Sequence, residues 1–247
     1  MNSKTLKLIA CISMVIDHVG LVIFDDSPIF RILGRIAFPI FAFFIGEGCL
    51  HTKNIKRYFL RLFGFGSAIQ LGLVAYTLLL VGRITPKAIC LHMNVMLTFS
   101  LSVAVCGAYL ALERCVREGR TKKETARAAL VFAAVLAVLF CLGIFFTHSR
   151  EWVGYRFSLD YSTVGVLLPL FAIMTRDPDR RLWLFGLGIV LVCLAYTSEL
   201  WYTWFALLSL PLIASYNGER GRVGFRYGFY IFYPLHLVII YLIGAFV

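Results

Sequence analysis

LKLIACISMVIDHVGLVIF, residues 6–24, is an apolar segment that carries three ionisable side chains, Lys7, Asp17 and His18. Ionisable groups inside a membrane helix are costly, so a partner or a reaction usually accounts for them. On an ideal helix, eleven steps of about 100° return Lys7 and His18 to nearly the same face, about 16 Å apart along the axis. We therefore predict that one helix face links a membrane surface to a buried imidazole.

The rest of the chain repeats this apolar character. Of 247 residues, 60% are hydrophobic and 15% are charged, which is more apolar surface than a soluble fold of this length can bury. Nine apolar runs, each judged against the ~20 residues that a spanning helix needs, lie at 6–24, 29–50, 58–81, 88–112, 128–146, 161–175, 182–197, 200–215 and 227–246. We expect an all-α, polytopic integral membrane helical bundle of about nine transmembrane helices, forming a single domain over residues 1–247.

The positive charge has a topological explanation. The formal net charge is +11, but the basic residues form short clusters between apolar runs, which favours membrane orientation over nucleic-acid binding. With nine spans, 18 of the 24 Lys and Arg residues fall in the N-terminal segment and the alternate loops that follow it. The positive-inside bias then predicts a multi-pass protein of the inner (plasma) membrane with a cytoplasmic N-terminus.

Further polar residues occur at a similar depth in other runs. Arg31 and Arg35 are one helical turn apart, and His236 lies two residues after Pro234 near the middle of the last run. The side chains that we expect to converge near His18 are Arg31, Arg35, Asn94, Thr98, Asp160, Tyr161 and His236.

Structural roles for these residues stay open at this point. Asp17 and Arg35 also fit an ion pair between two helices, because a buried charge needs a counter-ion whatever its function. His18 and His236 also fit structural roles. The seven cysteines are scattered without a C-x-x-C pair, and no metal site is predicted.

With a cytoplasmic N-terminus, His18 lies beyond the bilayer midplane, on the opposite side from the basic loops. This position suits acid–base or nucleophilic chemistry of the imidazole. An imidazole acts as a general base for an amine or hydroxyl acceptor, or accepts an acyl group itself, and a neighbouring carboxylate such as Asp17 can fix its tautomer. Basic side chains on the cytoplasmic face suit an anionic donor such as a nucleotide-bearing thioester. This combination favours acyl transfer across the membrane.

Several segments, in the same order along the chain, resemble one family of membrane proteins. After residues 6–24 come FRILGRIAFPIFAFFIGEGCLHTKNIKRYFLRLF (30–63), NVMLTF (94–99), LDYSTVGVLL (159–168), YNGER (216–220) and FYIFYPLHLVIIYLI (229–243). Together they look like the TraX family, which is known for N-terminal acetylation of conjugative pilin. The TraX family in turn resembles membrane acyltransferases whose first helix carries a basic residue, ten intervening residues and a histidine. Lys7 and His18 match that spacing.

The resemblance implies an integral membrane acetyltransferase that takes acetyl groups from cytoplasmic acetyl-CoA. The acceptor would be an extracytoplasmic amine or hydroxyl compound, such as a pilin peptide. The resemblance also makes His18 the base or acyl carrier and Asp17 its orienting carboxylate. Residues that would shape the pocket are Arg35, Asn94, Asp160, Tyr161 and His236; those that would bind the CoA phosphates are Lys7, Arg31, Lys53, Lys56, Arg57 and Arg61. The alternative function is a non-enzymatic membrane transporter or pilus-assembly scaffold.

Overall fold

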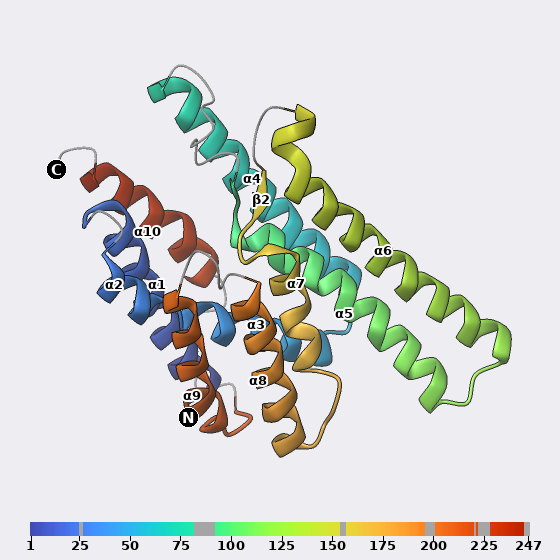
Figure 1. The fold of residues 1–247 in the computed structure, drawn as a ribbon. Coiled ribbons are helices and arrows are strands. Elements are labelled where there is room, and N and C mark those ends of the chain that lie inside the picture. The colour runs from blue at the N-terminus through green and yellow to red at the C-terminus, as the bar shows by residue number, and fades with distance from the viewer. Residues whose placement is uncertain are drawn as a thin grey trace. The chain divides into compact units, whose positions relative to one another are not determined.

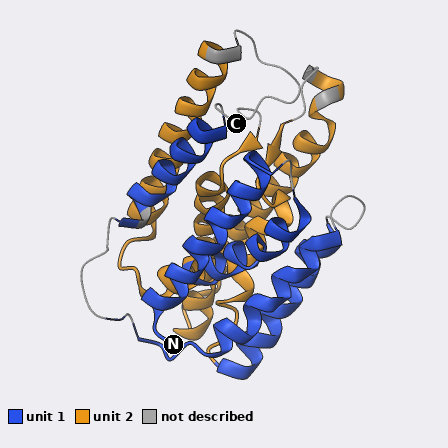
Figure 2. Ribbon diagram, turned by 90° about the vertical axis from the view of Figure 1, so that its left-hand side faces the viewer, with its two compact units in different colours: residues 1–44, 177–247 blue, residues 45–176 orange. Residues whose placement is uncertain are grey.

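The protein is described by a computed structural model over residues 1–24, 27–81, 92–153, 157–195, 201–219, 221 and 228–244. In these ranges it is helical apart from connections and one pair of two-residue strands, so the all-α expectation is confirmed (Figure 1). The chain divides into two compact units, residues 1–44 with 177–247 and residues 45–176 (Figure 2). The expectation of a single domain stays a prediction, since compact units within a membrane bundle can belong to one domain.

The first unit is built from both ends of the chain. Helix α1 packs against α2 and α10, and the 3₁₀ helix η2 contacts α2, α8 and α9. The elements are α1 (Ser3–Val22), α2 (Pro28–Gly34), the first half of α3 (Ala37–His51), α8 (Pro178–Leu194), η2 (Trp201–Leu208), α9 (Ser209–Ala214) and α10 (Gly228–Gly244). Backbone hydrogen bonds join Ser3 to Glu219 and Asn217 to Met1, at 2.9 Å each, so the start of α1 is tied to the segment after α9.

Two glycines let α1 and α2 approach each other closely. A Cβ added at Gly20 would lie 2.2 Å from the Cβ of Phe30, and one added at Gly34 would lie 2.2 Å from Oδ1 of Asp17. Neither distance leaves room for a methyl group. This close contact between helices holds the C-terminal half of α1 in place.

The second unit is organised around α5, which contacts α4, α6 and α7 (Figure 1). Its elements are α4 (Ile55–Val81), β1 (His92–Met93), α5 (Val95–Arg117), α6 (Lys122–Val153), β2 (Ser158–Leu159) and α7 (Ser162–Phe171). Val105, Leu139, Leu159 and Val166 form a buried apolar cluster between them. Strands β1 and β2 pair in parallel, so the starts of α5 and α7 lie side by side.

Local sequence explains where α6 begins. The Thr121 hydroxyl accepts a hydrogen bond from the Glu124 amide at 3.3 Å, and the Glu124 carboxylate accepts one from the Thr121 amide at 3.1 Å. This reciprocal arrangement is a capping box. Past it, the most apolar 18-residue window of α6 has only 6% of its residues buried, as expected for a helix surrounded by lipid.

Each of the nine predicted apolar runs contains a helix. Five helical segments in the described ranges are long and apolar enough to cross a membrane: Ser3–Val22, Pro28–His51, Ile55–Leu79, Val95–Arg117 and Lys122–Ser149. The helices Ser162–Phe171, Trp201–Ala214 and Tyr230–Gly244 are apolar but shorter. The protein is therefore an integral membrane helical protein, while the count of nine spans stays a prediction. Parts of the runs at 88–91, 196–197, 200, 227 and 245–246 lie outside the described residues.

The close contact between α1 and α2 predicts the effect of a small substitution. Gly20→Ala should lower the free energy of unfolding by about 1–3 kcal/mol, because the added methyl group overlaps Phe30. Gly72→Ala, in α4, is the matched control, since an added Cβ there has no neighbour within 4 Å and alanine favours the helix. Thermal unfolding in detergent, followed by circular dichroism, measures both. Equal melting temperatures for the two variants would show that this contact is looser than the structure indicates.

Candidate active site

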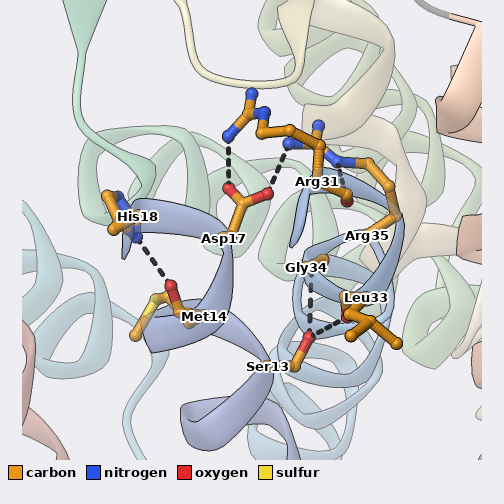
Figure 3. Close-up of polar contacts among 8 residues, drawn as sticks. All are labelled: Ser13, Met14, Asp17, His18, Arg31, Leu33, Gly34 and Arg35. Carbon is orange, nitrogen blue, oxygen red and sulfur yellow. Dashed lines mark hydrogen bonds and ion pairs between the residues drawn. The ribbon is translucent and has the colours of Figure 1, made fainter. Parts of the chain in front are cut away.

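The His18 ring, in the last turns of α1, is held by its own helix. Its Nδ1–H donates a hydrogen bond to the carbonyl oxygen of Met14 at 2.8 Å (Figure 3). Because a carbonyl only accepts, this bond assigns the proton to Nδ1. Nε2 then carries a lone pair. The side chain is partly buried, so the ring offers a base in a mostly apolar setting.

His236, in α10, repeats the arrangement. Its Nδ1–H donates to the carbonyl oxygen of Phe232 at 2.9 Å, and its ring stacks on the Phe232 ring with centroids 4.8 Å apart. The residue is only 6% exposed, and its Nε2 is buried without a hydrogen-bond partner among the described residues. A buried polar atom of this kind requires an explanation, and a bound reactant is one.

The two imidazoles face each other. Their centroids are 5.1 Å apart and their planes meet at 80°, so α1 and α10 bring together residues 218 positions apart in the chain. With both protons on Nδ1, both Nε2 atoms are acceptors and do not hydrogen-bond to each other. Such a pair suits a group that delivers a proton, such as an amine or a hydroxyl. This contact agrees with the expectation that His236 is one of the residues near His18.

The neighbouring residue Asp17 lies in a different set of contacts. Its Oδ2 accepts a hydrogen bond from Nη1 of Arg31 at 2.7 Å, and its Oδ1 accepts one from Nη2 of Arg35 at 2.8 Å (Figure 3). The guanidinium carbons lie 5.9 and 5.4 Å from the ring centroid of Tyr202, in η2. Asp17 and Arg35 are buried. The structural ion pair that the sequence left open is therefore present, with Arg31 as an additional member.

These contacts correct the expected role of Asp17 as the carboxylate that orients His18. Adjacent residues on a helix point about 100° apart, so Asp17 faces α2 while His18 faces α10. The carbonyl of Met14, one turn earlier, holds the His18 tautomer instead. Arg31, expected to bind the CoA phosphates, shares the Asp17 carboxylate with Arg35.

Asn94, in the second unit, has a well-defined structural role. Its side chain accepts a hydrogen bond from the Met96 amide and so caps α5, and it donates to the Gly66 carbonyl at 2.8 Å and to Gln70 Oε1 at 3.0 Å. These bonds join α5 to α4. The convergence of Asn94, Asp160 and Tyr161 on His18 stays a prediction.

The segment that contains Asp160 and Tyr161 is strained. Tyr161 and Ser162 have φ angles of +61° and +56°, in the left-handed region that side chains other than glycine seldom adopt. Each such residue costs on the order of 1–3 kcal/mol. The turn is held by the Asp160 amide, which donates to the Met93 carbonyl at 3.1 Å, and by the Thr98 hydroxyl, which donates to the Asp160 carbonyl at 3.0 Å. Strain that the surroundings enforce is typical of functional segments, so Asp160 and Tyr161 stay candidates.

The predicted basic residues occupy two kinds of environment. Lys7 lies over the Phe44 ring, 4.7 Å from its centroid, and is partly buried. The remaining four are exposed, in the loop before α4 and its first turns: Lys53, Lys56, Arg57 and Arg61. No group of three or more His, Cys, Asp or Glu side chains suited to a metal ion occurs in the described part of the chain.

Sequence reasoning missed three contributors to this site. The i−4 spacing of Met14 from His18, and of Phe232 from His236, is visible in the sequence and could have indicated the tautomer. Tyr202 had no such signal, because its position beside Arg31 and Arg35 depends on how η2 packs against α2.

The buried ion cluster predicts a large stability effect. Asp17→Ala should lower the free energy of unfolding by about 3–5 kcal/mol, because it leaves two guanidinium groups in an apolar setting without their shared carboxylate. Glu118→Ala is the control, since it removes an exposed carboxylate paired with Arg120 at 2.9 Å and should cost less than about 1 kcal/mol. Thermal unfolding in detergent compares the two. Similar costs would mean that Asp17 is more accessible to water than the structure shows.

Comparison with known proteins agrees with the resemblance. The profile of the family described as TraX protein matches residues 2–244. A relative in Dichelobacter nodosus, named probable fimbrial assembly protein FimC, serogroup H1, is 29% identical over 95% of this chain and 92% of its own length. An uncharacterised protein of Rickettsia prowazekii (strain Madrid E) is 54% identical over 41 residues, which is 17% of this chain and 16% of that protein. No solved structure matches. With a match over nearly its whole length, the chain belongs to the TraX family.

Proposed function

We propose that this protein is an integral membrane acetyltransferase that moves an acetyl group from cytoplasmic acetyl-CoA to an amine or hydroxyl acceptor outside the inner membrane. The observation that carries the proposal is the pair of facing imidazoles, His18 and His236, each with its Nδ1 proton bonded to its own helix. Two proton-accepting Nε2 atoms in an apolar setting are suited to remove a proton from an acceptor.

His18 acts in one of two ways. As a general base, its Nε2 takes the acceptor's proton while the acceptor nitrogen or oxygen bonds to the thioester carbonyl carbon; the C–S bond breaks and the proton passes to the leaving thiolate. As an acyl carrier, Nε2 itself bonds to the carbonyl carbon as the C–S bond breaks and the thiolate leaves; the acceptor then bonds to that carbon, the Nε2–C bond breaks, and the acceptor's proton passes to the thiolate. His236 positions the acceptor in both cases.

The choice of reaction and acceptor rests on similarity to known proteins. The TraX resemblance supports acetyl transfer from acetyl-CoA, and the name of the Dichelobacter nodosus relative supports an acceptor connected with fimbriae, such as a pilin peptide. The positive-inside bias of the loops supports a cytoplasmic N-terminus in the inner membrane. Asn94, Asp160 and Tyr161 are the further candidates for shaping the pocket.

A second candidate function is a non-enzymatic scaffold for fimbrial assembly or a transporter. The buried Asp17–Arg31–Arg35 cluster favours it, because such a network stabilises helix packing without any chemistry. The relative's name as an assembly protein is compatible with it. This function predicts that purified protein neither binds acetyl-CoA nor transfers its acetyl group.

Substitution of His18 tests the proposal. Purified protein in proteoliposomes receives radiolabelled acetyl-CoA and a peptide with a free N-terminal amine, and labelled peptide is counted. His18→Gln should reduce transfer by about 10²–10⁴-fold, because glutamine supplies no base of suitable pKa. His148→Gln is the matched control, since His148 makes the same bond to an i−4 carbonyl, Ile144, at 3.1 Å but stacks on Trp152. Full transfer by the His18 variant would rule out its catalytic role.

His236 requires its own measurement. His236→Gln should lower transfer by about 10–100-fold, with the larger change in the KM for the acceptor, because His236 holds the acceptor rather than the acetyl group. An unchanged KM in the His236 variant would assign this residue a structural role.

A separate measurement tests whether His18 is acetylated. A pre-steady-state burst of free CoA without acceptor would indicate an acetylated His18, and its absence would indicate direct transfer.

A further inference from the structure

Two cations in the first unit lie over neighbouring aromatic rings. Nζ of Lys7, in α1, is 4.7 Å from the Phe44 centroid, and Cζ of Arg181, in α8, is 4.4 Å from the Phe43 centroid. Both rings belong to α3, and their centroids are 5.7 Å apart. Two helices far apart in the chain therefore each place a cation over one of two adjacent rings of α3.

The rings beneath these cations are packed together. Phe43 contacts Phe185 at 5.6 Å and Tyr216 at 6.0 Å between centroids, and Phe44 contacts Tyr216 at 5.4 Å, all edge to face. Phe43, Phe44 and Phe185 are buried. We call these four rings the aromatic shelf. A rigid shelf fixes the positions of two otherwise flexible side chains.

Stacking on a ring does not by itself prevent a cation from binding an anion. A guanidinium group that lies face-on over a ring donates its N–H groups within its own plane, in the fork that matches phosphate. Cation–π contacts are weak, so they orient the charges more than they neutralise them. Glu47, four residues after Phe43 on α3, is paired with His51 at 3.5 Å.

The distance from the shelf to His18 matches the proposed donor. Lys7 and His18 are about 16 Å apart along one face of α1. The pantetheine arm of CoA has a chain about as long as four or five peptide residues, or roughly 15 Å when extended. A donor whose phosphates contact Lys7 can therefore present its thioester to the His18 ring.

We propose that Lys7 and Arg181, held over the aromatic shelf, bind the phosphate groups at the nucleotide end of the acyl donor. The inference rests on the proposed function and deepens it, because it assigns Arg181 and the shelf to donor recognition. Phosphate groups also occur in lipid headgroups, and the experiment separates the two sources.

Binding to wild-type and variant protein in phosphatidylcholine nanodiscs tests this site by titration calorimetry. The ligands are CoA, 3′,5′-ADP, which keeps phosphates of the nucleotide end, and acetyl-pantetheine, which has none. Arg181→Gln and Lys7→Gln should each lower the affinity for CoA and for 3′,5′-ADP by about tenfold, because charge-assisted hydrogen bonds are lost. The affinity for acetyl-pantetheine should change by less than twofold. Arg180→Gln removes an equal charge from the adjacent, exposed position and should change no affinity by more than twofold.

The outcomes separate this inference from the proposed function. Wild-type protein that binds no CoA contradicts both, whereas wild-type binding that Arg181→Gln leaves unchanged contradicts the shelf alone. A third outcome is that phosphatidylglycerol in the nanodiscs competes with CoA, that this competition requires Arg181, and that Arg181→Gln leaves the affinity for CoA unchanged. This outcome would assign the shelf to lipid and overturn the inference. If Arg181→Gln fails to fold, Arg181→Lys replaces it; this variant keeps the charge but loses the planar fork, and it should weaken CoA by about threefold.

Discussion

Hydrocarbon offers no hydrogen-bond partners, so a polar group in an apolar segment must find its partner inside the protein. The first unit meets this constraint in two ways on adjacent residues of α1. Asp17 shares its carboxylate between Arg31 and Arg35, and His18 bonds to the carbonyl of Met14. The carboxylate arrangement neutralises charge and ties α1 to α2. The imidazole arrangement uses only Nδ1, so Nε2 keeps its lone pair. The same constraint that stabilises the helix therefore sets the tautomer that a base requires.

Hydrophobic runs predicted most of the fold, because an apolar segment that spans lipid has few alternatives to a helix. The details that were missed depend on contacts between distant segments. The second run contains α2 and α3 with a break after Gly34; Arg35 lies at this break and contacts Asp17. The run at 200–215 begins as a 3₁₀ helix. Strands β1 and β2 have two residues each, too short for any periodicity to reveal.

The candidate site divides in the same manner. His18, His236 and the Asp17–Arg35 pair were predicted because ionisable groups stand out in apolar sequence. The role of Asp17 was misassigned because adjacency in sequence was taken as adjacency in space, although neighbouring helix residues point about 100° apart. Tyr202 was missed because its place in the site comes from the two arginines that α2 and the turn after it place beside its ring. The charge and the depth of a residue can be read from one segment of the sequence, whereas the convergence of several residues depends on packing between segments.

The two ring centroids can lie 5.1 Å apart only because the backbones that carry them approach closely. Glycines allow this approach on both sides of α1. Gly20 in α1 and Gly34 in α2 let these two helices approach closely, and a Cβ at Gly244 of α10 would lie 2.5 Å from a methyl carbon of Val22. The end of α1 is thus clamped between two helices, while its beginning is tied to the segment after α9. A helix fixed at both ends is a rigid spacer of constant length. That rigidity would give the separation between Lys7 and His18 a function, since a donor gripped at one end is positioned at the other without further contacts.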